Sequence, residues 1–564
     1  MPRIGVFVCH CGINIAGTVD VERVAEALGQ DPAVAFATHY KYMCSDPGQQ
    51  LIQNAIAEHD LDGVIVAACS PAMHERTFRQ AVAVAGLNPY RCEIANIREQ
   101  CSWVHQQDRE RATAKAVEIV RSMVEKVRQD EELVPLRMPI TRRALVIGGG
   151  VAGMEAALDI ANAGFPVILV EREDRLGGKM ARLSGTYLNF EAAPGLLEER
   201  IRQVLEHPNI DVLLSAQVTQ TEGYVGNFTV EVQQPDGLKR YEVGAVVVAT
   251  GWDPYPMERL PEYGGGAIPD VVDGLTFEEM LRTGLRRPSD GRVPQEVVFV
   301  QCAGSRDPEH GVSYCSKVCC MYVARQAMMF KERVPEGQAY VFYIDIRSGG
   351  KGYDEFVQRA MEEYDVLYLR GKVSKIFRRG DKVVVWGADT LVGRPVEVEA
   401  DLVVLATAML PSREAPSLAQ TLHIQADRYG FYSEAHPKLR PVESLTAGVF
   451  LAGAGQGPKD IPEAVAQAAG AAAKVIQLFT QEAMIQEPTV AYVVEELCSA
   501  CGACVAVCPY GAREIHPVRR IATVNPALCQ TCGACVVACP NKASRIHNWE
   551  PVQVLAMADV LFSG

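Results

Sequence analysis

Two runs of cysteine near the C-terminus share one spacing. Each run has three cysteines separated by two residues and a fourth cysteine three residues later, which is followed by proline. The first run is Cys498, Cys501, Cys504 and Cys508, and the second run is Cys529, Cys532, Cys535 and Cys539. In this repeat the fourth cysteine of each run ligates the cluster of the other run. Zinc is the alternative, but zinc sites favour pairs of cysteines over triplets. We therefore predict two 4Fe-4S clusters.

A glycine-rich turn lies between an apolar strand at residues 144–147 and a helix at residues 154–163. The residues of this turn that could contact a ligand are Gly148, Gly150, Val151, Ala152 and Gly153. Glycines here let a pyrophosphate approach a helix N-terminus. A second strand at residues 167–170 ends at Glu171, which could accept a hydrogen bond from a ribose hydroxyl. This unit predicts a dinucleotide site and leaves the choice between FAD and NAD open.

Three later segments resemble flavoproteins that contain two dinucleotide-binding domains, and this resemblance favours FAD. Residues 175–179 resemble the second glycine contact of these proteins, residues 246–251 the strand that returns the chain to a second domain, and residues 448–455 the closing flavin motif. The family has aspartate where this chain has Ala454, and the helix after Asp460 would direct its N-terminal dipole toward the flavin. The cofactor-binding residues that the resemblance adds are Arg172, Gly178, Lys179, Thr250, Gly251, Gly453, Ala454, Ile461 and Ala464.

The second nucleotide domain of such a flavoprotein, expected over residues 293–395, has no glycine loop here. The strand at residues 296–300 is followed by Gln301 and Cys302, so the backbone cannot come close to a pyrophosphate. The cysteines of this region are Cys302, Cys315, Cys319 and Cys320. Their chemistry alone is compatible with a third cluster, with buried thiols or with a redox disulfide.

Residues 302–306 and 314–322 resemble the FAD-containing iron-sulfur subunit of heterodisulfide reductase, the HdrA family, and this resemblance extends over almost the whole chain. It implies that the four cysteines of the second domain ligate a 4Fe-4S cluster near the flavin. Methanogen members carry an inserted ferredoxin domain, whereas residues 190–250 of this shorter form hold no cysteine. Those members also have a lysine near flavin N5 at the position of Arg325. Because arginine keeps the charge and the donors, we predict that Arg325 is the catalytic residue that tunes the flavin.

The pattern of residues 1–130 predicts a small doubly wound parallel sheet. Strands at residues 4–8, 34–38, 63–67 and 93–95 alternate with helices that begin near residues 20, 48, 75 and 98. The cysteines that follow these strands are Cys9, Cys11, Cys44, Cys69 and Cys101. Ligands bind beyond the carboxyl ends of such strands. We expect Cys44, Cys69 and Cys101, with either Cys9 or Cys11, to hold a cluster. Cys92 precedes its strand and is interpreted as a structural thiol.

The composition is that of a soluble globular protein. The chain has 564 residues, enough for three to four domains, with 48 % hydrophobic and 22 % charged residues. A net charge of −14 argues against nucleic-acid binding. We expect no signal peptide and no membrane span, hence a cytoplasmic protein. Disulfides are rare in that compartment, so the 18 cysteines point to metal sites.

The predicted fold class is α/β with five segments. They are an N-terminal α/β iron-sulfur domain (1–130), the first part of a thioredoxin-reductase-like FAD-binding domain (141–292), a degenerate nucleotide domain with a 4Fe-4S site (293–395), the second part of the FAD-binding domain (396–485) and a bacterial-type α+β ferredoxin domain (489–549). Residues 129–140 are acidic, contain two prolines and are interpreted as an irregular linker.

The resemblance implies an oxidoreductase component with one FAD and four 4Fe-4S clusters that performs flavin-based electron bifurcation. In that process the flavin takes an electron pair and sends single electrons along separate paths. The implied partners are B-type and C-type subunits, a hydrogenase, formate dehydrogenase or similar donor, and ferredoxin, around a homodimer. The alternatives are a non-bifurcating electron-wiring scaffold, the flavin component of an acyl-CoA reductase complex and a stand-alone NAD(P)H reductase. The missing glycine loop weighs against the last of these.

Overall fold

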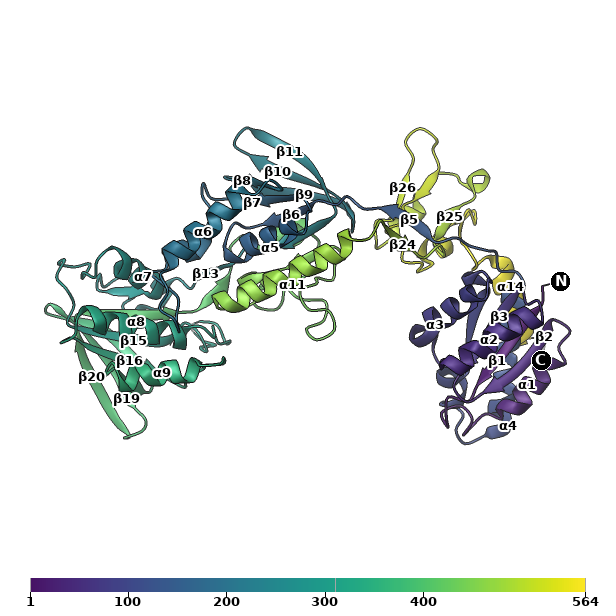
Figure 1. The fold of residues 1–564 in the computed structure, drawn as a ribbon, viewed down its shortest axis with the longest axis horizontal. Helices are drawn as coiled ribbons and strands as arrows, with labels where there is room; N and C mark the ends of the chain where they lie inside the picture. The colour runs from purple at the N-terminus through teal and green to yellow at the C-terminus, as the bar shows by residue number, and fades with distance from the viewer. Residues whose placement is uncertain (1, 310, 563–564) are drawn as a thin grey trace. The chain divides into compact units, whose positions relative to one another are not determined.

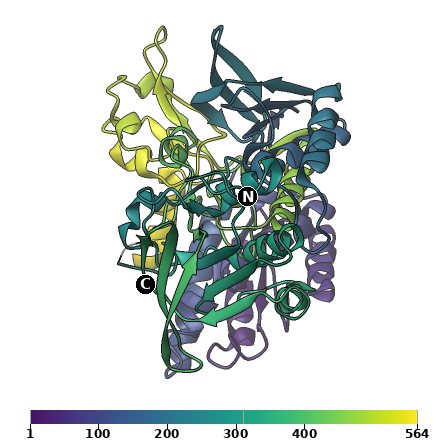
Figure 2. The same cartoon turned by 90° about the vertical axis from the view of Figure 1, so that its left-hand side faces the viewer.

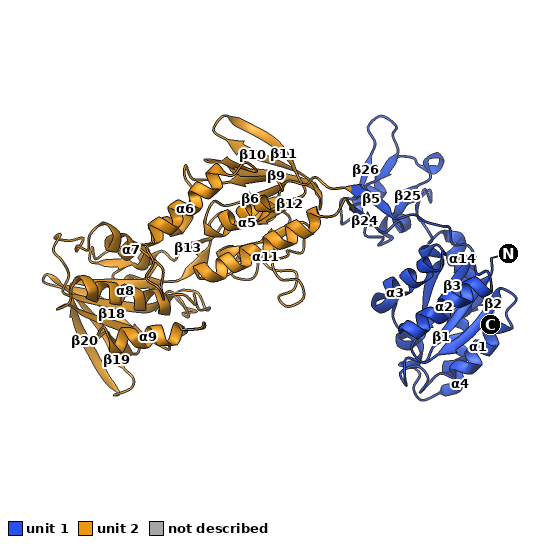
Figure 3. Cartoon of the chain, in the orientation of Figure 1, with its two compact units in different colours: residues 1–138, 484–564 blue, residues 139–483 orange. Residues whose placement is uncertain are grey.

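A computed structural model describes residues 2–309 and 311–562 of the chain and divides them into two compact units (Figure 3). The first unit combines residues up to Met138 with those from Met484 onward, so it joins the N-terminal domain to the C-terminal module. The second unit runs from Pro139 to Ala483. No helix among the described residues is long and apolar enough to cross a membrane.

The N-terminal domain is a parallel sheet, as predicted, and its strand order is β2-β1-β3-β4. Its strands are β1 (Ile4–Cys9), β2 (Val34–Tyr40), β3 (Gly63–Ala68) and β4 (Cys92–Asn96), and its helices are α1 (Val21–Gly29), α2 (Asp46–Glu58), α3 (Pro71–Val84) and α4 (Arg109–Val127). Strands β1 and β3 are buried along their whole length. A parallel strand of this kind needs cover on both faces, and apolar side chains from α1 and α4 provide it on one of them.

The C-terminal module consists of short elements around two cysteine-lined loops. They are β25 (Ala491–Val493), α12 (Ala503–Ala506), β26 (Arg513–Ile515), β27 (Ala522–Val524), α13 (Ala534–Ala538), β28 (Ser544–Ile546) and α14 (Pro551–Phe562). Helix α14 packs against α4 of the N-terminal domain. At this contact Gln553 donates a hydrogen bond to Asp130 over 2.8 Å, and the buried ammonium of Lys126 contacts the same carboxylate.

The segment at residues 129–140 is more regular than expected. Its last part forms β5 (Leu136–Pro139), which pairs with β24 (Ala483–Gln486). The prolines predicted an irregular linker because proline cannot donate a ladder hydrogen bond. An edge position in a two-stranded sheet tolerates that loss.

The first sheet of the second unit has the order β23-β12-β6-β7-β8, and all its pairings are parallel. Its strands are β6 (Ala144–Ile147), β7 (Val167–Val170), β8 (Ile210–Leu213), β12 (Ala245–Val248) and β23 (Val449–Leu451). The flanking elements are α5 (Val151–Asn162), α6 (Ala193–Glu206), α10 (Ala415–Thr421), α11 (Ile461–Phe479) and the antiparallel strands β9 (Gln217–Tyr224), β10 (Asn227–Gln234) and β11 (Gly237–Val243). Helices α5 and α11 pack side by side (Figures 1 and 2). Strand β6 lies between β7, the next strand in the chain, and β12, which comes later. The strand order therefore reverses at β6, and open α/β sheets bind ligands at such a switch point.

The second sheet of this unit has the order β14-β21-β15-β16-β17. Its strands are β14 (Val271–Asp273), β15 (Glu296–Ala303), β16 (Gln338–Tyr343), β17 (Leu367–Arg370) and β21 (Leu402–Thr407). The accompanying elements are α7 (Gly274–Thr283), α8 (Cys319–Arg333), α9 (Tyr353–Glu362), the antiparallel strands β18 (Val373–Arg379), β19 (Lys382–Asp389) and β20 (Arg394–Ala400), and the pair β13 (Trp252–Pro254) and β22 (Met409–Pro411).

This second domain is wider than the predicted range 293–395. Strands β14 and β21 belong to its sheet, although the prediction assigned both to the FAD-binding domain. A three-residue strand such as β14 has too few residues to show a period in the sequence. Its place is decided by parallel pairing with β21, a partner that lies far along the chain.

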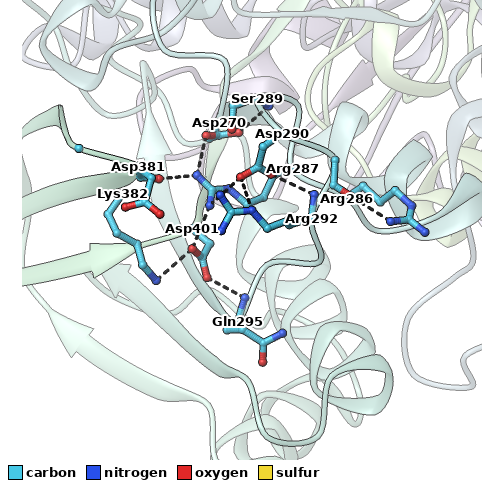
Figure 4. Close-up of polar contacts among 12 residues, drawn as sticks. Asp270, Arg286, Arg287, Ser289, Asp290, Arg292, Gln295, Asp381, Lys382 and Asp401 are labelled. Carbon is cyan, nitrogen blue, oxygen red and sulfur yellow. Dashed lines mark hydrogen bonds and ion pairs between the residues drawn. The ribbon is translucent and has the colours of Figure 1, made fainter.

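A buried ionic cluster ties together the amino ends of three strands of the second sheet (Figure 4). Asp270, Gln295 and Asp401 each directly precede one of these strands. The guanidinium of Arg287 contacts Asp270 over 3.1 Å and Asp401 over 3.3 Å. Asp401 also accepts a hydrogen bond from the backbone N–H of Gln295. Because these strands are parallel, their carboxyl ends all lie at the opposite edge of the sheet.

Candidate cofactor sites

Two pockets in the C-terminal module are each lined by four cysteines. The first pocket is lined by Cys498, Cys501, Cys504 and Cys539, and the second by Cys508, Cys529, Cys532 and Cys535. This is the grouping expected from the sequence, with the fourth cysteine of each run in the other pocket. No three His, Cys, Asp or Glu side chains of the described residues converge to hold a single metal ion. A cluster of four irons spreads its thiolates further apart than one ion does.

Backbone N–H groups point at several of these sulfurs. Ala522 N donates to the sulfur of Cys498 over 3.3 Å, Ala491 N to Cys529 over 3.4 Å and Ala543 N to Cys539 over 3.2 Å. Burial alone would raise the pKa of Cys539, but backbone N–H groups from residues 541–544 more than offset it and lower the pKa. Such donors stabilise thiolate, which is the form that binds iron. The lining of both pockets therefore fits an iron-sulfur cluster.

The glycine-rich turn between β6 and α5 is packed so closely that side chains are excluded. A Cβ on Gly153 would lie 1.8 Å from the carbonyl oxygen of Gly148. Gly148 itself has a φ of +110° and abuts the backbone of Ala249. Gly150 is the N-cap of α5, and no side chain caps this helix. Val151 and Ala152 form its first turn, so their backbone amides are left for an anion such as a pyrophosphate.

Glu171 lies at the end of β7, and its carboxylate is held by the backbone. It accepts hydrogen bonds from Gly149 N over 2.6 Å and from Glu173 N over 2.9 Å. These bonds fix the carboxylate beside the turn, and its remaining lone pairs can accept ribose hydroxyls. The neighbouring Arg172 forms an ion pair with Glu414.

The remaining predicted flavin residues lie on the strand ends and loops around this turn. Gly178 approaches Gly150, because a Cβ on it would lie 3.1 Å from the Gly150 Cα. Lys179 forms an ion pair with Asp253 over 3.1 Å. Thr250 lies just beyond the end of β12 and contacts the hydroxyl of Tyr432 over 3.4 Å. Gly251 has a φ of +71°.

The closing flavin motif follows β23 and leads into α11. Gly453 has a φ of +71°, and a Cβ on it would lie 2.7 Å from the Ala152 Cβ. Ala454 is buried beside it, Ile461 begins α11, and Ala464 is buried one turn later. Parallel pairing of β23, β12, β6 and β7 thus brings the predicted cofactor residues of four separate segments to one edge of the sheet.

The N-terminus of α11 is fixed by contacts with a loop of its own domain and with the second domain. Asp460 caps the helix and accepts hydrogen bonds from the hydroxyls of Tyr187 over 2.8 Å and Tyr353 over 2.7 Å. Glu463 in the first turn forms an ion pair with Lys317, which lies in the cysteine loop of the second domain. Neither tyrosine was singled out in the sequence, because no motif marks them.

Three of the four cysteines in the second domain are in direct contact. Cys302 interrupts the register of β15 with a φ of +59°, and Cys319 and Cys320 begin α8. A hydrogen bond with Cys319 lowers the pKa of Cys302 against the effect of burial, and the guanidinium of Arg306 acts in the same direction. Cys315 lies close enough to Arg306 to affect it electrostatically. The structure thus gathers Cys302, Cys319 and Cys320 at the carboxyl end of β15, and the place of Cys315 in the predicted set stays a prediction.

Arg325 lies on α8 and is 3 % exposed. Its guanidinium donates hydrogen bonds to Glu278 and to the hydroxyl of Ser184, each over 3.1 Å. No motif in the sequence marks Glu278. Its carboxylate balances the positive charge of Arg325, and the predicted effect of Arg325 on the flavin depends on that charge. Ser184 follows the segment of Gly178 and Lys179, so Arg325 contacts the chain near predicted flavin residues. Its tuning role stays a prediction.

Four N-terminal thiols lie together at the carboxyl edge of the sheet. The sulfur of Cys9 accepts hydrogen bonds from Cys11 N over 3.3 Å and Met43 N over 3.4 Å. Cys9 interacts electrostatically with Cys44, and Cys69 does so with Cys11. Burial raises the pKa of Cys9 to about 11. A bound metal would reverse that effect, since it favours thiolate.

Cys101 is placed differently from the expectation. It lies in a π-helix at Arg98–Ser102, and its thiol donates a hydrogen bond to the carbonyl oxygen of Ala112 over 3.1 Å. Its side chain is fully buried in the core between the sheet and α4. The same π-helix instead directs Arg98 to the sulfur of Cys11 over 3.4 Å. Strand order alone placed Cys101 at the edge, but the turn after β4 rotates it into the core. Cys92 is fully buried at the start of β4.

Arg513 is a buried residue of the C-terminal module that the sequence motifs did not reveal. It lines the second pocket and donates to the sulfur of Cys535 over 3.0 Å. Aligning the two cysteine runs would have found it, because Arg513 occupies the same position after Cys508 that Ser544 occupies after Cys539.

Two family models match the chain. One is described as pyridine nucleotide-disulphide oxidoreductase and matches residues 113–286, and the other is a 4Fe-4S dicluster domain that matches residues 491–540. Among solved structures, thioredoxin reductase of T. acidophilum is 18 % identical with a TM-score of 0.43, covering 60 % of this chain and 100 % of that one.

Curated relatives cover nearly the whole chain. An iron-sulfur subunit of CoB–CoM heterodisulfide reductase from Methanopyrus kandleri is 41 % identical, with 91 % of each chain covered. The corresponding subunit of the H2:CoB-CoM heterodisulfide,ferredoxin reductase from Methanothermobacter thermautotrophicus is 39 % identical with the same coverage. That of the H2/formate:CoB-CoM heterodisulfide,ferredoxin reductase from Methanococcus maripaludis is 36 % identical, with 91 % of this chain and 90 % of that one covered. With its dinucleotide fold and its 4Fe-4S dicluster domain, the chain is an oxidoreductase that belongs to the HdrA family of heterodisulfide reductase components.

Proposed function

We propose that this chain binds one FAD and four 4Fe-4S clusters and is the bifurcating component of a heterodisulfide-reductase-like complex. The observation that carries the proposal is the gathering of Cys302, Cys319 and Cys320 at the carboxyl end of β15, where a nucleotide-binding domain would have its glycine loop. Iron-sulfur clusters carry single electrons, and FAD exchanges electrons in pairs or singly. A flavin beside such a site can pass electrons to a protein-bound acceptor.

The residues around β6 fit FAD. The uncapped first turn of α5 supplies backbone N–H groups for the pyrophosphate, and Glu171 is oriented for the ribose. Asp460 caps α11 and accepts hydrogen bonds from two tyrosine hydroxyls. These contacts fix the helix N-terminus and hence the direction of its dipole. A fixed dipole favours negative charge on a ligand near the helix N-terminus.

The second domain and the flavin domain are held together by charge and by hydrogen bonds. Lys317 lies two residues after Cys315 and pairs with Glu463 in the first turn of α11. These contacts support a direct path between the third cluster and FAD. Arg325, with its partner Glu278, would set the charge on the same side of the cofactor.

For the N-terminal cluster we propose the ligands Cys9, Cys11, Cys44 and Cys69. Hydrogen bonds and electrostatic contacts link these thiols at one edge of the sheet. Cys101 was expected to take one of these places, but its thiol is committed to the carbonyl of Ala112.

The partners that we propose are B-type and C-type subunits, a hydrogenase or formate dehydrogenase as donor, and ferredoxin, in a complex built on a homodimer. The proposal draws on the names of the relatives, which include H2, formate, a CoB–CoM heterodisulfide and ferredoxin. Mass measurement of the purified complex tests the stoichiometry.

The decisive experiment measures coupling in the reconstituted complex. The chain is purified anaerobically with its neighbouring subunits and supplied with a donor, ferredoxin and a disulfide acceptor. Bifurcation predicts that omitting either acceptor stops reduction of the other. Independent reduction of each acceptor would instead indicate a wiring scaffold. Cofactor analysis of the chain should give about sixteen iron atoms, about as many sulfides and one FAD. A value near eight iron atoms would exclude the two sites outside the C-terminal module.

A further inference from the structure

Arg513 and Ser544 occupy equivalent positions of the internal repeat. Each lies five residues after the last cysteine of its run and begins a short strand, β26 for Arg513 and β28 for Ser544. The two positions differ in chemistry, since one carries a guanidinium and the other a small hydroxyl. The two halves of the module are therefore asymmetric at this position.

The two side chains meet between the two cysteine-lined pockets. Arg513 lines the second pocket, Ser544 lines the first, and Arg513 Nη2 donates a hydrogen bond to the hydroxyl of Ser544. The same nitrogen donates to the sulfur of Cys535 over 3.0 Å.

The charge of Arg513 has no acidic partner among the described residues. Its side chain is 5 % exposed, and the second terminal nitrogen, Nη1, is buried without a hydrogen-bond acceptor. The other strongly buried arginines, Arg287 and Arg325, are paired with carboxylates. Burying a guanidinium without a counter-charge is costly, so a negatively charged group is expected beside it.

An iron-sulfur cluster held by four thiolates is such a group. It is an anion, and each added electron makes it more negative. Hydrogen bonds to the sulfurs and nearby positive charge stabilise the reduced form and raise the reduction potential. Arg513 provides both to the second pocket, through Cys535, and only its charge to the first.

We propose that Arg513 is the shared counter-charge of the two clusters in the C-terminal module and that it makes their reduction potentials unequal. The cluster held by Cys508, Cys529, Cys532 and Cys535 has the higher potential and takes the first electron. The other cluster, held by Cys498, Cys501, Cys504 and Cys539, is reduced at lower potential. The inference rests on the proposed presence of these two clusters.

The test is a potentiometric titration of the anaerobically purified full chain, followed by electron paramagnetic resonance. Arg513→Met removes the charge and the donors, Arg513→Gln removes the charge but keeps an amide donor, and Arg513→Lys keeps the charge. We expect the Met variant to lower the potential of the second-pocket cluster by about 59 mV or more, a tenfold change in a one-electron equilibrium. The Gln variant should show a smaller fall, and the Lys variant should stay closest to wild type. A Cys532→Ser background changes the spectrum of one cluster and so assigns the signals.

Arg545→Gln is the matched control. Arg545 lies in the same module, next to Ser544, but its guanidinium pairs with Glu550 and lines neither pocket. It should leave both potentials unchanged. Equal potentials of the two clusters in wild type, or unchanged potentials in the Gln and Met variants, would overturn the inference. The proposed function would stand in either case if the iron content showed that both clusters are present. Loss of iron from all three Arg513 variants would show that Arg513 acts only in folding, and this result would also overturn the inference. A wild-type chain without iron in this module would refute the proposed function itself.

Discussion

At the scale of single residues, the groups that touch each thiol separate candidate ligands from structural cysteines. The sulfur of Cys9 receives two backbone N–H donors, at 3.3 and 3.4 Å, and makes only a longer donor contact of 3.9 Å to the carbonyl of Lys41. Backbone N–H groups likewise point at Cys498, Cys529 and Cys539 in the C-terminal pockets. The thiol of Cys101 is itself a donor, to a carbonyl. Two N–H donors stabilise a thiolate at Cys9 and favour metal binding, whereas the 3.1 Å bond from the Cys101 thiol to a carbonyl favours the neutral thiol there.

The N-terminal cysteines give the first prediction. Replacing Cys69 by alanine should lower the iron content of the chain by about four atoms, one cluster. The same change at Cys92 or Cys101 should leave the iron content at the wild-type value, because both thiols are buried away from the proposed set. Iron and sulfide analysis of the anaerobic protein is the measurement. Iron loss in the Cys101 variant equal to that of Cys69 would return Cys101 to the ligand set.

The Arg325–Glu278 pair gives the second prediction. Glu278→Gln removes the balancing carboxylate and keeps the shape of the side chain, so it should raise the flavin reduction potential. Arg325→Gln removes the positive charge and should lower it, with every cluster retained. A flavin titration of both variants checks the opposite signs. If neither variant moves the flavin potential, the pair acts only in packing. Arg325→Ala is less informative, because it also removes the hydrogen-bond donors and leaves a cavity in the buried site.

At the scale of elements, close packing at one turn positions the cofactor and a buried ionic cluster holds the second domain. The turn from β6 to α5 leaves no room for a side chain at Gly153. In the second domain, Arg287 joins the amino ends of strands that come from distant parts of the chain. The turn lies at the carboxyl ends of the strands of the first sheet, where ligands bind. The ionic cluster lies at the amino ends of the strands of the second sheet.

Glycine substitutions test the turn. Gly153→Ala should abolish FAD binding, because its Cβ would lie 1.8 Å from a carbonyl oxygen and would force the turn open. The control is Gly195→Ala in α6, where a Cβ would have no neighbour within 4 Å. That change should keep FAD and stabilise the helix by up to about 1 kcal/mol. FAD content after gel filtration distinguishes the two. Full FAD occupancy in the Gly153 variant would contradict the proposed site.

Arg287→Ala tests the ionic cluster. It leaves Asp270 buried without its cationic partner, while Asp401 keeps Lys382, and it should lower the free energy of unfolding by about 3–5 kcal/mol. Arg292→Ala in the same loop should have little effect, because that side chain is 67 % exposed and forms a surface ion pair with Asp290. Denaturant unfolding followed by flavin fluorescence compares them. Equal stability of the two variants would show that the cluster contributes nothing measurable.

At the scale of the whole molecule, the chain keeps the plan of a flavoprotein with two dinucleotide domains and alters the second one. The carboxyl end of β15 carries cysteines where glycines would admit a pyrophosphate. Electrons would then enter and leave through proteins rather than through a soluble nucleotide.

The whole-molecule prediction is that the cofactor-loaded chain has no dedicated site for NADH or NADPH. Equilibrium titration with either nucleotide should show no saturable binding at micromolar concentration, and neither nucleotide should bleach the flavin rapidly without a partner. Reduced ferredoxin or a donor enzyme serves as the positive control for flavin reduction. Micromolar binding, or rapid bleaching by NADH alone, would contradict the assignment of the second domain.

Local spacing was enough to predict several features from the sequence. The eight cysteines of the C-terminal module divide between two pockets as their spacing indicates, because short loops leave few ways to arrange four ligands. The dinucleotide turn was predicted for the same reason, since strand, glycines and helix are contiguous. The parallel pairing of the N-terminal strands was predicted from their alternation with helices, whereas their order came from the structure.

What only the tertiary structure decided are the contacts between side chains that lie far apart along the chain. Glu278 meets Arg325, Arg513 reaches Cys535 and Ser544, and β14 joins the second sheet beside β21. The position of Cys101 depends on one π-turn that rotates it into the core. Hydrophobic period and motif spacing describe neighbours in sequence, whereas partner choice in a close-packed interior depends on shape and charge across elements. The sequence therefore determined which cofactors this protein is built to hold, and packing determined which charges surround them.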